Sequence, residues 1–191
     1  MNEVFYLSRI IENPKELILE KAKEILCNQG YSHLSMRTLA KECDIALGTI
    51  YNYYPTKKDL VIEMMTGYWK EYFKIMQVII ASDDNLYIRL KKIFNELNLF
   101  IKQFKEIWLK PELYDKPDYV ESGIEKENIY IDKFIRVIES MLIKEASDDK
   151  ITLKLDSYET AKFIILNFIT MIQMPIFNYS SFEIILKEIL Q

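Results

Sequence analysis

Residues 35–58 decide the fold, and they read SMRTLAKECDIALGTIYNYYPTKK. Ser35 is a favoured N-cap residue, and a short amphipathic run over residues 36–43 follows it. Asp44 comes next, and aspartate tolerates the left-handed backbone of a tight turn. A second short helix is predicted over residues 47–54. Two short helices joined by such a turn predict a helix-turn-helix.

This stretch also meets the packing demands of a helix-turn-helix. Ala40 supplies a small residue where the second helix must cross the first. Ile45, Ile50 and Tyr54 supply apolar anchors for the inner face of the second helix. The outer face of that helix is then left to enter the major groove of DNA, which is about 12 Å wide.

Helix caps divide the rest of the chain, and no stretch alternates with the period of two that a strand requires. Ser122 with Glu125, and Ser180 with Glu183, each have the spacing of a capping box. Pro175 is expected to kink or end a helix, and residues 111–119 to be irregular or a single turn. The predicted further helices cover residues 14–30, 57–81, 86–108, 122–145, 157–178 and 181–190.

The fold class is therefore all-α, with about nine helices. The early helices are short with tight turns, whereas the later ones are long and amphipathic. We expect an N-terminal three-helix helix-turn-helix DNA-binding domain at residues 1–55. We expect a C-terminal helical ligand-binding and dimerisation domain at residues 56–191.

Composition excludes several other classes. The chain has 191 residues, half of them hydrophobic, so it can form a core. Four glycines and five prolines are too few for a turn-rich β fold. Cys27 and Cys43 fall at apolar-periodic positions, so we expect small core residues rather than a disulfide or metal site. The net charge of −4 excludes a uniformly basic nucleic-acid binder, although not a local binding surface.

Three segments together carry a family resemblance. They are Gly30-Tyr31 with residues 35–40, then Gly-Thr-Ile-Tyr-Asn-Tyr-Tyr at residues 48–54, then Thr-Lys-Lys-Asp-Leu at residues 56–60. This combination resembles the TetR family of bacterial repressors over residues 14–62. Beyond that span the chain is similar to the family only in length and helical character.

The resemblance implies a homodimer that binds a palindromic double-stranded DNA operator and is released by a small-molecule effector held in the C-terminal body. By the family pattern, Ser35 and Arg37 would touch phosphates at the start of the helix predicted over residues 36–43. Lys57 would hold a phosphate at the start of the helix predicted over residues 57–81, the fourth along the chain. The residues that would lie in or beside the major groove are Leu47, Gly48, Thr49, Tyr51, Asn52 and Tyr53.

The chemistry of these residues agrees in part. Gly48 lets the backbone approach DNA, and Thr49 and Asn52 can hydrogen-bond base edges or phosphates, with Asn suited to adenine. Against this, Asp44 places a carboxylate near DNA, and Leu47 stands where the family commonly has a polar or basic residue. Ala46 replaces a usual capping residue. Residues 31–60 carry four basic and three acidic groups, so we expect a shallow salt dependence.

The C-terminal body is rich in large apolar side chains, which form either plain core or the wall of a cavity. A cavity would suit a small, largely apolar or aromatic effector, with Asn167, Thr170 and Gln173 as polar groups of the pocket or of a dimer face. A ligand beside residues 69–73 would tilt the fourth helix and change the spacing of the two reading helices. The candidate ligand-binding residues are Trp69, Tyr72, Phe73, Phe104, Trp108, Phe134, Phe168 and Met171.

The last two helices resemble the family's dimerisation pair. Their apolar residues exceed what one neighbouring helix needs, and a four-helix bundle across a two-fold axis would bury them. The residues concerned are Ile164, Ile165, Phe168, Ile169, Ile172, Ile184, Ile185 and Ile189.

Other functions fit less well. His33 is the single histidine, expected at the surface, and no acid–base pair, nucleophile elbow or metal spacing indicates an enzyme, a metal or a cofactor. Residues 1–11 lack a secretory pattern, and residues 163–177 are too short to span a membrane, so we expect a cytoplasmic protein. The alternative is a helical ligand-binding or interaction module with a vestigial DNA-binding head. The sequence does not separate repressor from activator.

Overall fold

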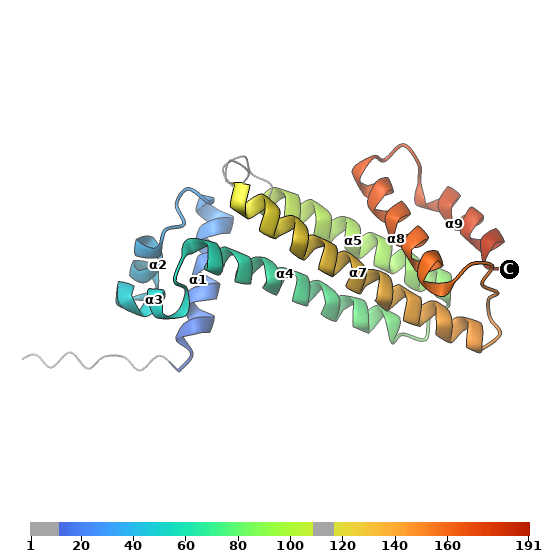
Figure 1. The fold of residues 1–191 in the computed structure, drawn as a ribbon, viewed down its shortest axis with the longest axis horizontal. Helices are drawn as coiled ribbons and strands as arrows, with labels where there is room; N and C mark the ends of the chain where they lie inside the picture. Colours follow the sequence, from blue (N-terminus) through green and yellow to red (C-terminus); the bar gives the residue numbers. More distant parts are fainter. Residues whose placement is uncertain (1–11, 109–116) are drawn as a thin grey trace, which may run out of the picture. The chain divides into compact units, whose positions relative to one another are not determined.

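The computed structural model describes the backbone of residues 12–108 and 117–191 and the side chains of residues 12–105 and 129–191 (Figure 1). This part of the chain contains eight helices and no strand, which confirms the all-α prediction. The chain divides into two compact units, Met1–Gly67 and Tyr68–Gln191. Among the described residues, no helix combines the length and the hydropathy needed to cross a membrane.

The N-terminal unit holds α1 (Pro14–Gln29), α2 (Met36–Cys43), α3 (Leu47–Tyr53) and the first part of α4 (Lys57–Ile80). The predicted caps form these helices. The Asn13 side chain accepts a hydrogen bond from the Glu16 amide at 3.3 Å, and Pro14 occupies the first turn. Gly30 ends α1 with a φ of 86°, which an L-residue rarely adopts. The core of the unit consists of apolar side chains of all four helices, such as Ile18, Leu39, Ile50 and Leu60.

The C-terminal unit holds the rest of α4 with α5 (Leu86–Trp108), α7 (Pro117–Ser147), α8 (Ser157–Gln173) and α9 (Tyr179–Ile189). In Figure 1, α4, α5 and α7 run lengthwise beside one another, and α8 packs on α7 and α5. A buried ion pair joins two helices of this unit: Arg89 of α5 donates to Glu145 of α7 and, at 3.1 Å, to the Ile80 carbonyl.

The structure corrects four predictions. The capping box at Ser122 is wrong because α7 already begins at Pro117, so residues 117–119 are helical; residues 111–116 lie outside the described part. Asn178, not Ser180, caps α9, and its side chain accepts from the Ser181 amide at 2.9 Å. Cys27 is exposed, so only Cys43 is the core residue that we expected. Cys27 lies on the side of α1 opposite the fully buried Ile18, and so away from the core.

Candidate functional site

The turn between α2 and α3 is built by Asp44. This residue has φ 52° and ψ 45°, the left-handed conformation that the sequence predicted. The Asp44 amide donates to the Lys41 carbonyl at 3.2 Å, and the Ile45 amide donates to the Ala40 carbonyl at 3.1 Å. These bonds close the end of α2 and set the direction in which α3 leaves.

The inner face of α3 is held by two apolar anchors. Ile50 is fully buried and Tyr54, directly after the helix, is 2% exposed, as the sequence predicted. Ile50 is the single buried residue within α3 itself, and Ala46 makes no side-chain cap. The helix therefore depends on packing against α2 rather than on its own capping.

The outer face of α3 is open to solvent. Gly48, Tyr51, Asn52 and Tyr53 are exposed, and Leu47 and Thr49 are half-buried; all six are predicted DNA-binding residues. A Cβ placed on Gly48 would meet no described atom within 4 Å, so the glycine is not needed for packing inside the protein. These six residues are all of α3 except Ile50, and they are here called the reading face.

The flanks of the reading face carry the predicted phosphate contacts. The Ser35 hydroxyl caps α2 by accepting from the Thr38 amide at 3.0 Å, and Arg37 in the first turn is exposed. Lys57, at the start of α4, lies against the turn after α1: its Nζ donates to the Tyr31 carbonyl at 3.0 Å and sits 3.5 Å from the centroid of the Tyr31 ring. The sequence did not predict this contact. A backbone carbonyl and a cation–π interaction together hold the Lys57 ammonium in place.

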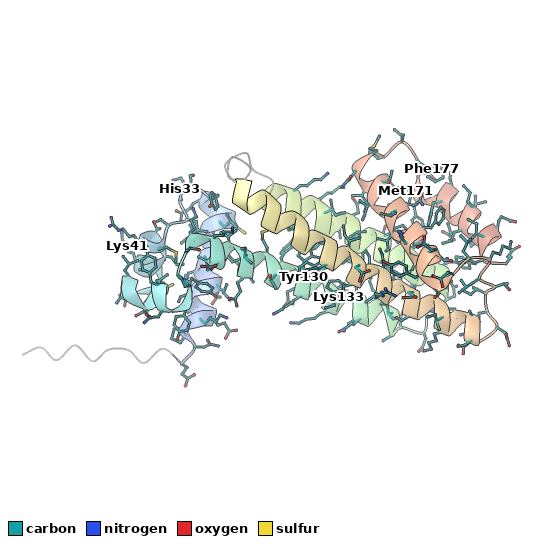
Figure 2. The ribbon with its side chains drawn as sticks, viewed as in Figure 1. His33, Lys41, Tyr130, Lys133, Met171 and Phe177 are labelled. Atoms are coloured by element: carbon teal, nitrogen blue, oxygen red, sulfur yellow. The ribbon has the colours of Figure 1, made fainter. Side chains whose placement is uncertain are left out.

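A second candidate site is a group of aromatic rings in the C-terminal unit, here called the aromatic cluster. Trp69 of α4 stacks on Tyr130 of α7 with centroids 4.9 Å apart, and it lies 4.5 Å from Phe100 of α5. Figure 2 shows Tyr130 on α7 with Lys133, whose Nζ lies 4.6 Å from the ring centroid of Phe73. The members of the cluster are Tyr68, Trp69, Tyr72, Phe73, Phe100, Phe104, Tyr130 and Phe134.

One polar atom is buried inside the aromatic cluster. Tyr72 is 3% exposed, and its hydroxyl has no hydrogen-bond partner among the described residues. Burial raises the pKa of this hydroxyl above its ordinary value, with a smaller contribution from the charge of Glu96. A buried hydroxyl without a partner costs free energy. The Tyr72 hydroxyl is therefore an unsatisfied hydrogen-bond donor within the cluster.

The predicted ligand-binding residues do not all meet in this cluster. Trp69, Tyr72, Phe73, Phe104 and Phe134 belong to it, and Tyr68, Phe100 and Tyr130 were missing from the prediction although they share its helical spacing. Phe168 of α8 is fully buried among other rings, those of Phe94, Tyr179 and Phe182. Met171 is buried on the same helix (Figure 2). The Trp108 side chain lies outside the described residues.

The outer surface of α8 and α9 exposes apolar side chains, but not all of those that were predicted. Ile164, Ile165 and Phe168 are fully buried within the unit, so their assignment to a dimer surface is wrong. The period of 3.6 gives the width of an apolar stripe but does not divide it between core and surface. The exposed residues, here called the α8–α9 face, are Phe163, Leu166, Ile184 and Ile185.

The polar residues of α8 point away from the core. Thr170 is exposed and donates to the Leu166 carbonyl at 2.8 Å, and Asn167 donates to the Phe163 carbonyl at 2.8 Å. Gln173 is exposed as well. Their position fits the edge of the α8–α9 face better than the wall of a buried pocket.

The geometry of α2, the turn and α3 defines a helix-turn-helix protein, and comparison with known proteins extends this assignment. Residues 18–64 match the family profile described as bacterial regulatory proteins, tetR family. The uncharacterized HTH-type transcriptional regulator YuxN of Bacillus subtilis is 31% identical over 74 residues, which cover 38% of this chain and 25% of YuxN. The matching part thus spans only a quarter of that relative's length.

Solved structures with the same fold cover nearly the whole chain. A transcriptional regulator from Cytophaga hutchinsonii has a TM-score of 0.70 at 17% identity, with 93% of each chain covered. FadR from Bacillus subtilis, crystallised with stearoyl-CoA, has a TM-score of 0.57 at 15% identity, with 91% of this chain and 95% of FadR covered. The match to the TetR family of bacterial regulatory proteins rests on residues 18–64, and the solved structures show that nearly the whole chain shares the fold of these regulators.

Proposed function

We propose that this protein is a cytoplasmic transcriptional regulator that binds a palindromic DNA operator through the reading face of α3. The observation that carries the proposal is the solvent-exposed outer face of a helix that is anchored on its inner side and positioned by a left-handed turn. No enzymatic role is part of the proposal. The alternative, an interaction module with a vestigial head, predicts the same fold without binding to DNA.

The proposed contacts divide into phosphate and base contacts. Ser35, Arg37 and Lys57 lie at helix starts, where backbone amides also favour an anion. These three residues would fix the register of the protein on the DNA backbone. To bind a phosphate, the Lys57 ammonium would either give up its hydrogen bond to the Tyr31 carbonyl or keep it and donate to the phosphate as well. The residues that would meet the major groove are Leu47, Gly48, Thr49, Tyr51, Asn52 and Tyr53.

The proposed active form is a homodimer whose two copies meet through the α8–α9 face. Ile184 is 65% exposed and Ile185 47% exposed on α9, and Phe163 and Leu166 are exposed on α8. A second copy related by a two-fold axis would present the same four side chains and would bury both sets in a four-helix bundle. Two reading helices would then contact two half-sites of a palindrome.

Ile184→Asp tests the proposed dimer by placing a charge in the interface. Sedimentation should show a monomer for this variant and a dimer for the parent chain. Val78→Asp is the matched control, because Val78 is 74% exposed on α4 and lies outside the α8–α9 face. A dimeric Ile184→Asp variant would contradict the proposed interface.

The proposed effector is a small, largely apolar molecule that enters the aromatic cluster and releases the DNA, which makes the protein a repressor. The Tyr72 hydroxyl supports this, because it has no hydrogen-bond partner among the described residues and an effector with one hydrogen-bond acceptor would supply one. Helix α4 supplies cluster residues at 68–73 and Lys57 at its start, so this helix is the proposed link between effector and DNA. A coupling of about 1–3 kcal/mol changes DNA affinity 5- to 150-fold.

Fluorescence anisotropy tests the proposed function. The protein is titrated against labelled DNA from upstream of its own gene, beside a Thr49→Ala/Asn52→Ala double variant. We expect tight binding to the parent chain and loss of specific binding in the variant. The complex is then titrated with aromatic compounds and with stearoyl-CoA, the ligand of the FadR structure. If refolded, ligand-free protein selects no sequence from a genomic library at low salt, the head is vestigial and the alternative holds.

A further inference from the structure

The reading face contains an unusual set of side chains for a protein that binds DNA. Helix α3 reads LGTIYNY and carries no arginine, lysine, aspartate or glutamate. The only side-chain amide on it belongs to Asn52, which is exposed. The remaining outward chemistry consists of one half-buried leucine, one half-buried threonine and two exposed tyrosines.

The geometry places Asn52 at the centre of the reading face. Gly48 and Asn52 are four residues apart, so they lie on one side of α3, and this side is opposite the fully buried Ile50. Helical side chains lean toward the N-terminus, so Asn52 projects along this side of α3 toward the turn that holds Gly48. Because the space above Gly48 is open, a base edge can approach the helix backbone there and meet the amide.

The chemistry of this centre favours one base pair. An asparagine amide donates to N7 and accepts from N6 of adenine at the same time, whereas guanine is read by arginine or lysine and cytosine by a carboxylate. Leu47, at the first position of α3, offers an apolar surface where the start of a reading helix meets base edges. The apolar partner in the major groove is the thymine methyl group.

The charges near the reading face belong to other elements. Arg37 and Lys41 are exposed on α2 (Lys41 is labelled in Figure 2), and the first helix of a helix-turn-helix crosses the DNA backbone. Lys57 lies against Tyr31. These cations are therefore placed for phosphates, which carry no sequence information.

Resting on the proposed function, we infer that the centre of each operator half-site is A·T, with adenine read by the Asn52 amide and a neighbouring thymine methyl read by Leu47. The specificity of this regulator then comes from an amide and an apolar side chain, without a guanine contact at the centre of the groove.

Selection from a randomised duplex library tests the inference. The parent chain should enrich a palindrome with A·T at the central position of each half-site. Asn52→Arg should enrich G·C at that same position, because arginine pairs with guanine. A change of preference cannot arise from misfolding. A parent palindrome with invariant G·C at the position that Asn52→Arg alters would overturn the inference, whereas enrichment of no palindrome at all would overturn the proposed function instead.

Base analogues in the selected operator test each contact separately. Replacing the central adenine by 7-deazaadenine removes N7 and should weaken binding about tenfold in the parent chain but not in Asn52→Ala. Replacing the thymine by uracil removes one methyl group and should weaken binding about fourfold. Leu47→Ala should be insensitive to that replacement. Equal sensitivity to uracil in Leu47→Ala and in the parent chain would overturn the role of Leu47.

Discussion

Gly48→Ala separates the stability of the protein from its binding to DNA. The added methyl group meets no described atom within 4 Å, and Gly48 has no left-handed φ, so alanine fits the folded chain. Replacing a helical glycine by alanine stabilises by about 0.5–1 kcal/mol. For a chain of this size that raises Tm by about 1–4 °C. We expect the variant to be slightly more stable than the parent chain.

The same methyl group should weaken DNA binding, because it occupies the space through which a base edge approaches α3. An extra methyl group in a close-packed contact costs about 1–3 kcal/mol. A cost of about 1.4 kcal/mol for each reading helix is tenfold, and two helices in a dimer make it about a hundredfold. Anisotropy with operator DNA measures the loss, and thermal melting measures the gain in stability.

Gly67→Ala is the matched control for this experiment. Gly67 lies inside α4, and a Cβ there also meets no described atom within 4 Å. The control should raise Tm by a similar amount and leave the affinity for operator DNA unchanged. If Gly48→Ala is stabilised and still binds DNA as tightly as the parent chain, α3 does not approach DNA at Gly48 and the assignment of the reading face is refuted.

Three further variants or measurements follow from single features. Asp44→Asn removes a carboxylate near the DNA and keeps a residue that tolerates φ of 52°, so affinity should rise several-fold at low salt; Asp149→Asn, at φ 55° in the other unit, should leave anisotropy titrations unchanged. Burial raises the pKa of the Cys43 thiol, whereas Cys27 is exposed; a thiol reagent should therefore label one cysteine in the native protein and two after denaturation, and fast labelling of both would be inconsistent with the packing of α2. Tyr72→Phe removes the buried hydroxyl without a partner; thermal melting should show a stabilisation of about 1 kcal/mol, and a destabilised variant would mean that the hydroxyl has a partner.

Local signals predicted the N-terminal unit closely. Asn13, Ser35 and Asp44 each act through neighbours within three or four residues, so their side-chain chemistry specifies the caps and the turn without help from the rest of the fold. The reading face follows from the same information, because a seven-residue helix with one anchored side has only one side left. Which of its residues contact DNA stays a prediction.

Long-range contacts explain what the sequence did not predict. The Lys57 ammonium meets the Tyr31 carbonyl 26 positions away in the chain, and no local pattern encodes that contact. In the C-terminal unit, periodicity identified an apolar stripe on α8 but not which of its residues are covered by α9. Phe168 was therefore assigned to a pocket and to a dimer face, although it is fully buried among rings of α5 and α9.

The small size of α3 has a consequence for how the free protein moves. Helices shorter than about 12 residues do not persist alone in water, and α3 has seven residues, one buried anchor and no side-chain cap. Its amide hydrogens should exchange with solvent through local opening, well before those of α1, which buries four residues. Bound DNA would suppress that opening, so the free energy of ordering α3 becomes part of the discrimination between an operator and other DNA.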